Sequence, residues 1–351
     1  MQPLADFDLA RPATLAEAAA LLAREGAMPL AGGTDLVPNL RRGLHAPSLL
    51  VDLGAVSGFG AVERSATHWR LGAGVTLAAL ASNDALAATL PAIVQAAREV
   101  AGPAHRSAAT LGGNLCQDTR CVYYNQSAWW REANGYCLKR APRSGPMARP
   151  APQGGSSGPA EPDPPERCDT VCHVAPQGQR CHAAFEGDVA PALIACDAEV
   201  ELAGPQGTRR LPLHQMYRDD GAAHLALARG ELVVALQVPL PAPGSASGYR
   251  KQRVRGAMDF PLAGVAVQLR REGAALSTLT VAISGTNSNP IRLAGTEALL
   301  GRAVDDALLA ELGKLVHKQV SPMRSTVTAA HHRRLVAAVA AQRLVRELWM
   351  R

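Results

Sequence analysis

The chain has 351 residues, which is enough for two or three domains with buried cores. Its 47% hydrophobic and 19% charged residues are typical of a globular protein and argue against disorder. The net charge of +6 is spread along the sequence without a Lys/Arg-rich run, so we expect no nucleic-acid partner. No signal peptide is recognised, and no apolar run reaches the roughly 18 residues of a membrane span, so we expect a cytoplasmic protein with no membrane partner.

The first elements in chain order have the pattern of a compact α/β unit. Thr14 and Glu17 form a capping box at the start of a predicted helix, because a hydroxyl and a carboxylate three positions apart can satisfy its first free amides. A short apolar strand at 28–30 leads into a Gly-Gly turn and a helix that ends near Arg41. A second buried strand is predicted at 49–53.

Alternating strands and helices continue along the chain as far as residue 240. Strand patterns occur at 69–74, 199–202 and 232–240, and helical patterns at 77–80 and 90–100. This region therefore predicts further mixed α and β structure.

Residues 140–167 interrupt this pattern. They contain eight prolines and four glycines and no aromatic residue. Such a segment cannot bury enough apolar surface to offset its ordering entropy, so we expect a flexible surface insertion.

A Pro/Gly/Ser stretch at 241–248 is predicted to be a linker to a C-terminal unit. Two strands followed by two helices are predicted there, at 263–269, 277–284, 305–319 and 329–349. The last helix carries an apolar stripe that we expect to be its buried face: Leu335, Val336, Val339, Leu344 and Leu348.

Two glycine pairs, at 31–35 and 110–115, each follow the predicted end of a strand or helix. Glycine lets a backbone approach a ligand closely, and amides at a helix start favour phosphate oxygens, so the two loops could grip opposite parts of a flavin dinucleotide. Spacing alone leaves this reading and two simple turns equally open. The sequence has no G-x-G-x-x-G motif after a strand and no Walker lysine motif, which disfavours a standard Rossmann or P-loop site.

Cysteines and aromatic residues are concentrated between residues 116 and 181. Six of the seven cysteines and five of the 13 aromatic residues lie there, and Cys196 alone sits in an apolar run typical of a core thiol. An odd number of cysteines without an export signal argues against disulfides and for metal binding or reactive thiols. Matched close pairs typical of zinc are absent, so the composition favours an iron–sulfur cluster while leaving zinc open.

Four motifs in this order resemble the FAD-binding subunits of the xanthine dehydrogenase and molybdenum hydroxylase family. They are Pro-Leu-Ala-Gly-Gly-Thr-Asp-Leu at 29–36, Ala-Thr-Leu-Gly-Gly-Asn-Leu at 109–115, Gly-Asp-Val-Ala-Pro-Ala-Leu at 187–193 and Tyr-Arg-Lys at 249–251. The resemblance covers nearly the whole chain.

This resemblance implies an α+β fold. A two-subdomain FAD-binding domain of the vanillyl-alcohol-oxidase/PCMH type would be followed by a smaller α+β C-terminal flavoprotein domain. We expect subdomain 1 at 1–55, subdomain 2 at 56–240 with an iron–sulfur loop at about 116–181, and the C-terminal domain at 245–351.

The resemblance also implies FAD as a cofactor and no catalytic residue in this chain. The FAD-binding residues it predicts are Pro29, Leu30, Ala31, Gly32, Gly33, Thr34, Asp35, Leu36, Thr110, Gly112, Gly113, Asn114, Asp188 and Lys251. The diphosphate would lie along the first loop and the flavin near the second. From the sequence alone, Asp188 is equally consistent with a helix cap, and Lys251 with a solvated strand lysine.

The residues from Cys116 to Cys181 lengthen the loop after the second glycine pair and resemble the β subunit of 4-hydroxybenzoyl-CoA reductase, whose extra loop holds a [4Fe–4S] cluster. The ligands implied by this resemblance are Cys121, Cys137, Cys172 and Cys181. Because the 140–167 insertion also brings Cys168, the third ligand is the least secure, and Cys168 could replace Cys172.

The implied function is electron transfer within a molybdenum-containing, 4-hydroxybenzoyl-CoA reductase-like enzyme. Its expected partners are a large molybdopterin-binding subunit, a small [2Fe–2S] subunit and a ferredoxin-like donor, in a dimer of heterotrimers. The alternatives are the FAD subunit of a molybdenum hydroxylase that oxidises another aromatic or heterocycle, and a zinc-binding, non-redox interaction protein.

Overall fold

A computed structural model describes residues 4–140, 171–256 and 258–351 of the chain. Apart from Arg140, the predicted insertion at 140–167 lies outside these residues, and so does Cys168. The described residues form three β-sheets, each accompanied by helices, in agreement with a mixed α and β fold. None of the described helices is long and apolar enough to cross a membrane.

The first sheet has three parallel strands in the order β1-β3-β2. Its strands are β1 (Asp8–Ala10), β2 (Ala27–Leu30) and β3 (Leu49–Asp52). They are accompanied by helices α1 (Leu15–Leu22) and α2 (Leu36–Arg41) and the 3₁₀ turn η1 (Leu53–Ala55). The predicted capping box is confirmed, because Glu17 N donates to Thr14 Oγ1 and Thr14 N to Glu17 Oε2, each at 3.2 Å.

The second sheet has five antiparallel strands in the order β4-β5-β8-β6-β7. Its strands are β4 (Val62–Arg64), β5 (His68–Gly72), β6 (Glu199–Gly204), β7 (Gly207–Pro212) and β8 (Leu232–Pro239). The helices between these strands are α3 (Leu77–Ala81), α4 (Asp84–Thr89), α5 (Pro91–Glu99), α6 (Pro103–Ala108), α7 (Leu111–Leu115), α8 (Ala128–Ala133), α9 (Val189–Ala195) and the 3₁₀ turn η2 (Leu213–Met216).

The third sheet has four antiparallel strands in the order β12-β11-β10-β9. Its strands are β9 (Ser245–Gln252), β10 (Ala263–Glu272), β11 (Ala275–Ser284) and β12 (Ile291–Arg292). Helices α10 (Asp306–Gln319) and α11 (Ala330–Trp349) follow, after the 3₁₀ turn η3 (Thr296–Leu299).

The predicted linker at 241–248 is wrong in its second half. Strand β9 begins at Ser245, which pairs with Arg270 of β10. Gly248 lies in this strand where a Cβ would come within 3.0 Å of Leu344 Cδ1. Small residues that resemble a linker in sequence are therefore used here for close contact between a strand and a helix.

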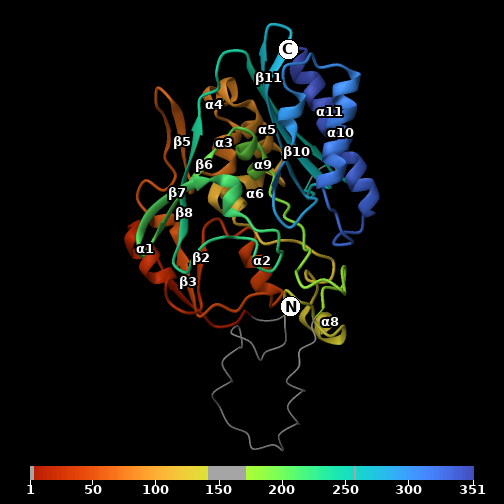
Figure 1. Cartoon of the computed structure of the whole chain (residues 1–351). Helices are drawn as coiled ribbons and strands as arrows, with labels where there is room; N and C mark the ends of the chain where they lie inside the picture. Colours follow the sequence, from red (N-terminus) through yellow and green to blue (C-terminus); the bar gives the residue numbers. More distant parts are fainter. Residues whose placement is uncertain (1–3, 141–170, 257) are drawn as a thin grey trace, which may run out of the picture.

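The sheets and helices form layers, as Figure 1 shows. Helices α5 and α9 lie between the five-stranded and four-stranded sheets, and α10 and α11 cover the other face of the four-stranded sheet. Because side chains alternate across a strand, Val265 and Val267 of β10 face α10 and α11, while Ala266 belongs to the core around α9. The four-stranded sheet is thus buried on both faces.

The predicted buried stripe of α11 is wrong at its N-terminal end. Leu335 is 57% exposed, and Val336 and Val339 are only half-buried. The buried face is instead made by Arg333, Ala337, Ala338, Ala340, Ala341, Leu344, Val345 and Leu348. Alanines allow the helix to approach the sheet closely, so the residues that bury best are not the largest ones.

A pair of leucine substitutions in α11 tests this assignment. Leu344→Ala removes a side chain that is 2% exposed and should lower the free energy of unfolding by about 2–5 kcal/mol. Leu335→Ala should change it by no more than about 0.5 kcal/mol, because its side chain is already in solvent. Urea denaturation of the two variants checks the order, and equal losses would contradict the assigned face.

Candidate functional site

The two glycine loops and Lys251, near the end of β9, line a cavity of about 610 Å³. Pocket volumes of roughly 300–1,000 Å³ are typical of small-molecule and cofactor sites. Of the 14 residues predicted to bind FAD, all except Leu30 line the cavity. Leu30 is the last residue of β2, and its side chain lies beneath the Gly33 turn, where a Cβ on Gly33 would be 3.4 Å from Leu30 Cδ1.

Close contact between the two loops depends on Gly32. A Cβ at this position would lie 1.9 Å from the carbonyl oxygen of Ala108, which is a backbone atom and cannot rotate away. Gly33 next to it has a φ of 69°, in the left-handed region that favours glycine. The first glycine pair is therefore required by backbone geometry at the cavity wall.

The second loop is held by its own N-cap. Thr110 precedes α7, and its Oγ1 accepts a hydrogen bond from Gly113 N at 3.1 Å. Gly112 N donates to Ala73 O at 2.7 Å, and a Cβ on Gly112 would lie 2.9 Å from the Ala73 Cβ. The second glycine pair thus lets α7 lie directly against the end of the five-stranded sheet.

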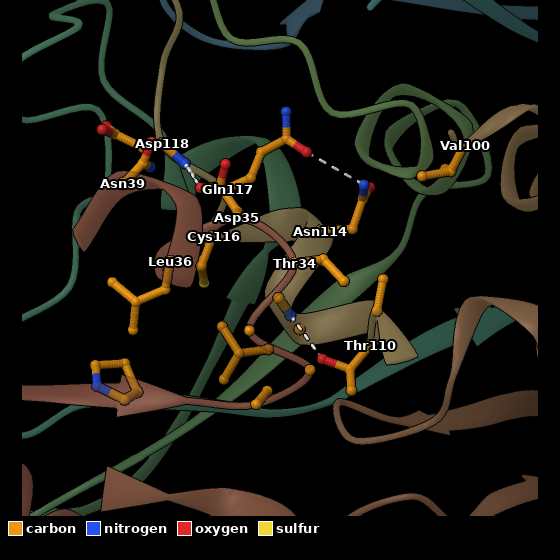
Figure 2. A pocket seen from close by; sticks show the side chains of 18 of the residues that line it. Thr34, Asp35, Leu36, Asn39, Val100, Thr110, Asn114, Cys116, Gln117 and Asp118 are labelled. Atoms are coloured by element: carbon orange, nitrogen blue, oxygen red, sulfur yellow. Dashed lines mark hydrogen bonds between the residues drawn. The ribbon is translucent and has the colours of Figure 1, made fainter. Parts of the chain in front are cut away.

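Asp35 ties the first loop to the segment after the second. Its carboxylate forms no cap for α2; it accepts from Asp118 N at 2.9 Å and pairs with the Arg120 guanidinium. Figure 2 shows Asp118 beside Asp35 across the cavity wall. A charged contact between residues more than 80 positions apart fixes the spacing of the two loops.

Asn114 connects the second loop to α9. Its Nδ2 donates to Gln117 Oε1 at 3.3 Å, and its Oδ1 accepts from Val189 N at 3.2 Å (Figure 2 shows the first of these contacts). Asn114 is 6% exposed, so it positions the wall as well as lining it.

Asp188 is part of a buried ion pair and does not cap α9. Its Oδ2 lies 2.9 Å from Lys251 Nζ, its Oδ1 accepts from the Tyr249 hydroxyl at 2.6 Å, and no side-chain cap bond is formed. The Lys251 ammonium also donates to Glu99 O at 3.1 Å, and its side chain is 1% exposed. Burial raises the pKa of Asp188, while Lys251 and Tyr249 oppose this rise. The interpretations of Asp188 as a helix cap and Lys251 as a solvated lysine are therefore wrong.

Sequence reasoning missed several polar residues of the cavity. Asn39, Gln117, Asp118, Arg120 and Glu186 also line it. The segment Gln-Asp-Thr-Arg directly follows the second glycine loop, and this adjacency was the one available signal for three of them.

Unsatisfied polar atoms at this wall show which kind of ligand fits. Among the described residues, Asn39 Nδ2, Gln117 Nε2 and Arg120 Nε are buried without a hydrogen-bond partner. Buried donors without partners are costly, and a ligand with phosphate, carbonyl or hydroxyl oxygens would satisfy them. A dinucleotide cofactor carries all three kinds of oxygen, so the cavity fits FAD in volume and in chemistry.

The extended loop after the second glycine pair carries the predicted cluster ligands. Cys137, Cys172 and Cys181 are buried, with exposed fractions of 5–7%, and Cys121 is half-buried. Burial, with contributions from Cys137 and Cys172, raises the pKa of Cys121 to about 11; burial, with contributions from Cys172 and Cys121, raises the pKa of Cys181 to about 12. The four thiols therefore lie near one another.

The arrangement of these thiols is that of free cysteines. Every cysteine among the described residues is unpaired, and within the same ranges no three His, Cys, Asp or Glu side chains are placed to hold a single metal ion. Cys116 lines the cavity instead, and Cys196 is completely buried in the core, as predicted. That the four cysteines are ligands stays a prediction.

The loop that carries these cysteines, at about 116–181 and called the cysteine-bearing loop below, is bonded to the cavity wall at both ends. Arg120 and Ala184 exchange two backbone hydrogen bonds of 2.7 Å. The Lys139 ammonium, in a side chain that is 5% exposed, lies 2.6 Å from Asp118 Oδ1 and donates to Thr119 O at 3.0 Å. Asp118 therefore borders the cavity and the cysteine-bearing loop at once.

Comparison with known proteins assigns nearly the whole chain. Residues 5–241 match the FAD binding domain in molybdopterin dehydrogenase, and residues 247–348 match the CO dehydrogenase flavoprotein C-terminal domain. The chain belongs to the FAD-binding medium subunits of xanthine dehydrogenase and CO dehydrogenase type molybdenum hydroxylases. The predicted fold class, an FAD-binding domain followed by a flavoprotein C-terminal domain, is confirmed, and FAD is the cofactor of the matching domain.

Relatives and solved structures cover the same length. The aldehyde oxidoreductase FAD-binding subunit of Escherichia coli is 33% identical over 87% of this chain and 90% of its own, and the carbon monoxide dehydrogenase medium chain of Afipia carboxidovorans is 28% identical over 97% and 95%. The structure of reconstituted CO dehydrogenase from Oligotropha carboxidovorans superposes with a TM-score of 0.76 at 25% identity and covers all of both chains.

His224 is a buried residue of the cavity that titrates below its usual range. It is 7% exposed, its Nε2–H donates to Gln117 O at 3.0 Å, and the ring lies 5.9 Å from that of Phe185. Burial, with a contribution from the Lys139 ammonium, lowers the pKa of His224 to about 4.

This shift predicts a loss of stability in mild acid. The unfolded chain takes up the His224 proton near pH 6.5 and the folded chain only near pH 4, so stability falls as pH drops through this window, by at most about 3 kcal/mol. His224→Gln should flatten this part of the pH dependence in denaturant unfolding. The same substitution at exposed His332 is the control, and an unchanged slope in His224→Gln would contradict the assignment.

Proposed function

We propose that this chain is the electron-transferring FAD subunit of a molybdenum hydroxylase-type complex. The observation that carries the proposal is the cavity between the two glycine loops, whose volume and unsatisfied donors fit a dinucleotide. Relatives described as medium chains and FAD-binding subunits match it over most of their length. Its partners in this proposal are a large molybdopterin-binding subunit and a small [2Fe–2S] subunit, in a dimer of heterotrimers.

Bound FAD would supply reversible two-electron chemistry, and the chain would supply its position and surroundings. The 29–36 loop and the donors of Asn39 and Gln117 would hold the diphosphate side. Gly112, Gly113 and Asn114 would lie by the flavin, with the Asp188–Lys251 pair as a fixed polar contact. Because Asn114, Asp188 and Lys251 are buried and held by hydrogen bonds or an ion pair, they can hold the flavin ring in one orientation and exclude water from it.

We further propose that Cys121, Cys137, Cys172 and Cys181 hold a [4Fe–4S] cluster. Three of them are buried, and the pKa values of Cys121 and Cys181 respond to the neighbouring thiols. In such a cluster each thiolate binds a different iron, so the four sulfurs need not converge on one ion. The Lys139–Asp118 contact places this loop against the wall of the cavity, which is the arrangement that electron passage between two centres requires.

The cysteine-bearing loop favours a 4-hydroxybenzoyl-CoA reductase-like complex fed by a ferredoxin-like donor. The alternative is the FAD subunit of a complex that oxidises another aromatic or heterocycle. The names of the relatives support it at least as well, because they include a caffeine dehydrogenase beside carbon monoxide and aldehyde enzymes. In both readings the substrate site lies in a partner subunit. Membership of this family argues against the third reading, a non-redox zinc protein.

Flavin content tests the cavity assignment. Gly32→Ala places a methyl group against the Ala108 backbone, so the loops must separate, and FAD bound per chain should fall at least about tenfold. Gly60→Ala is the control, because the nearest atom to its added Cβ would be 3.5 Å away. Flavin absorbance of the purified complex is the measurement, and full FAD occupancy in Gly32→Ala would contradict the site.

Iron content tests the cysteine assignment. Cys137→Ser should lose most of the roughly four irons per chain expected of a [4Fe–4S] cluster while keeping FAD. Cys196→Ala removes a core thiol remote from the loop and should keep both. Metal analysis with flavin absorbance separates the outcomes, since wild-type iron in Cys137→Ser, or zinc in place of iron, would overturn the ligand set.

A further inference from the structure

One buried carboxylate of the cavity, that of Glu186, forms no ion pair or hydrogen bond with the described residues. Glu186 precedes the Gly-Asp of the third family motif, lines the cavity and is 3% exposed. None of the described residues makes a hydrogen bond or a salt bridge within 4.0 Å to its side chain. It contrasts with Asp188 two residues later, whose carboxylate is fully engaged by Lys251 and Tyr249.

Three cations and one anion, from four different elements, act electrostatically on Glu186. They are Arg333 of α11, Arg120 of the segment after α7, Lys251 of β9 and Asp188 at the start of α9.

Each of the three cations is committed to another partner. Arg333, which is completely buried, donates to the carbonyl oxygens of Gly285, Met323 and Leu262. Arg120 is paired with Asp35, and Lys251 with Asp188. The three cations therefore stabilise the charged form of Glu186 from a distance, and none of them forms a direct ion pair with it. A direct ion pair would keep the carboxylate ionised.

Opposing effects act on the pKa of this carboxyl group, and burial is the largest of them. Burial disfavours its charged form, the three cations favour that form, and the outcome is a pKa raised to about 7. A carboxyl group with a pKa near 7 is partly protonated at neutral pH, so its protonation changes when a charge is added to the same cavity. With FAD bound, the added charge is that of the electrons that the flavin accepts.

We propose that Glu186 is the proton-uptake residue that balances charge when an electron pair enters the cofactor in this cavity. The inference rests on the proposed function. Two electrons delivered by the redox partners and one proton convert oxidised FAD to its anionic reduced form, and a second proton from solvent converts the Glu186 carboxylate to the acid. When the electrons leave, both protons return to solvent, so atoms and charge balance in each direction.

The experiment is a titration of the flavin reduction potential against pH in the intact complex, by spectroelectrochemistry. Reduction of the flavin adds negative charge to the cavity and raises the pKa of Glu186 further. Above a pH of about 7, reduction of the wild type should therefore be coupled to the uptake of one proton more per electron pair than reduction of a variant without this carboxyl group. The wild-type potential should therefore fall more steeply with pH than that of Glu186→Gln, in which the extra proton is lost.

Two further variants separate titration from packing. Glu186→Asp keeps a carboxyl group and should keep the steeper slope. Glu231→Gln alters a second carboxylate of the cavity wall. The Glu231 carboxylate is bound by Arg209 at 2.6 and 2.8 Å and by Ala228 N, and these contacts lower its pKa and keep it ionised. The potential of Glu231→Gln should therefore change with pH as steeply as that of the wild type.

The outcomes are distinct. Equal slopes in wild type and Glu186→Gln overturn the inference while leaving FAD binding intact. If Glu186→Gln does not fold, the wild type alone still tests the inference. A wild-type potential whose pH dependence corresponds to one proton per electron pair across the whole pH range would overturn it. A complex without flavin overturns the proposed function together with this inference.

Discussion

The site depends on the contact between two backbone segments that are far apart in sequence. Gly32 lies so close to the Ala108 carbonyl that no other residue fits, and the charged contact of Asp35 with Arg120 and the Asp118 amide holds the same two segments from the side. Both contacts are needed, because glycine permits close approach without providing attraction, and a charged pair provides attraction without fixing the distance. The cavity is what remains between segments fixed in this way.

Lys251 of the C-terminal domain and Asp188 of the FAD-binding domain complete this wall, and both are costly to bury. Lys251 and Asp188 are almost inaccessible to solvent. Lys251 is balanced by Asp188 and the Glu99 carbonyl, and Asp188 by Lys251 and the Tyr249 hydroxyl. A buried pair of this kind adds little net stability compared with apolar residues, but removing one partner would leave an uncompensated charge. The Lys251–Asp188 pair therefore fixes the position of β9 relative to α9, and both residues line the cavity.

Much of the fold and part of the site could be predicted from sequence, and the errors share a physical cause. The capping box and the left-handed φ of Gly33 depend on local geometry, which residue spacing records. The face of α11 and the strand at Ser245 depend on how closely another layer approaches, which local patterns do not record. The same holds for Arg120 and Glu186, whose charged neighbours include residues about 65 to nearly 150 positions away.

The cysteine-bearing loop raises the question of how one chain can lengthen a loop beside its cofactor site without distorting that site. Arg120 and Ala184 exchange paired backbone hydrogen bonds, which close the neck of the loop on the cavity side of the cysteines. Closure of a loop whose ends are already fixed costs an entropy that grows only with the logarithm of its length. The residues between Lys139 and Cys172 can therefore vary in number while Asp118, held by Asp35 on one side and Lys139 on the other, keeps the same position in the wall.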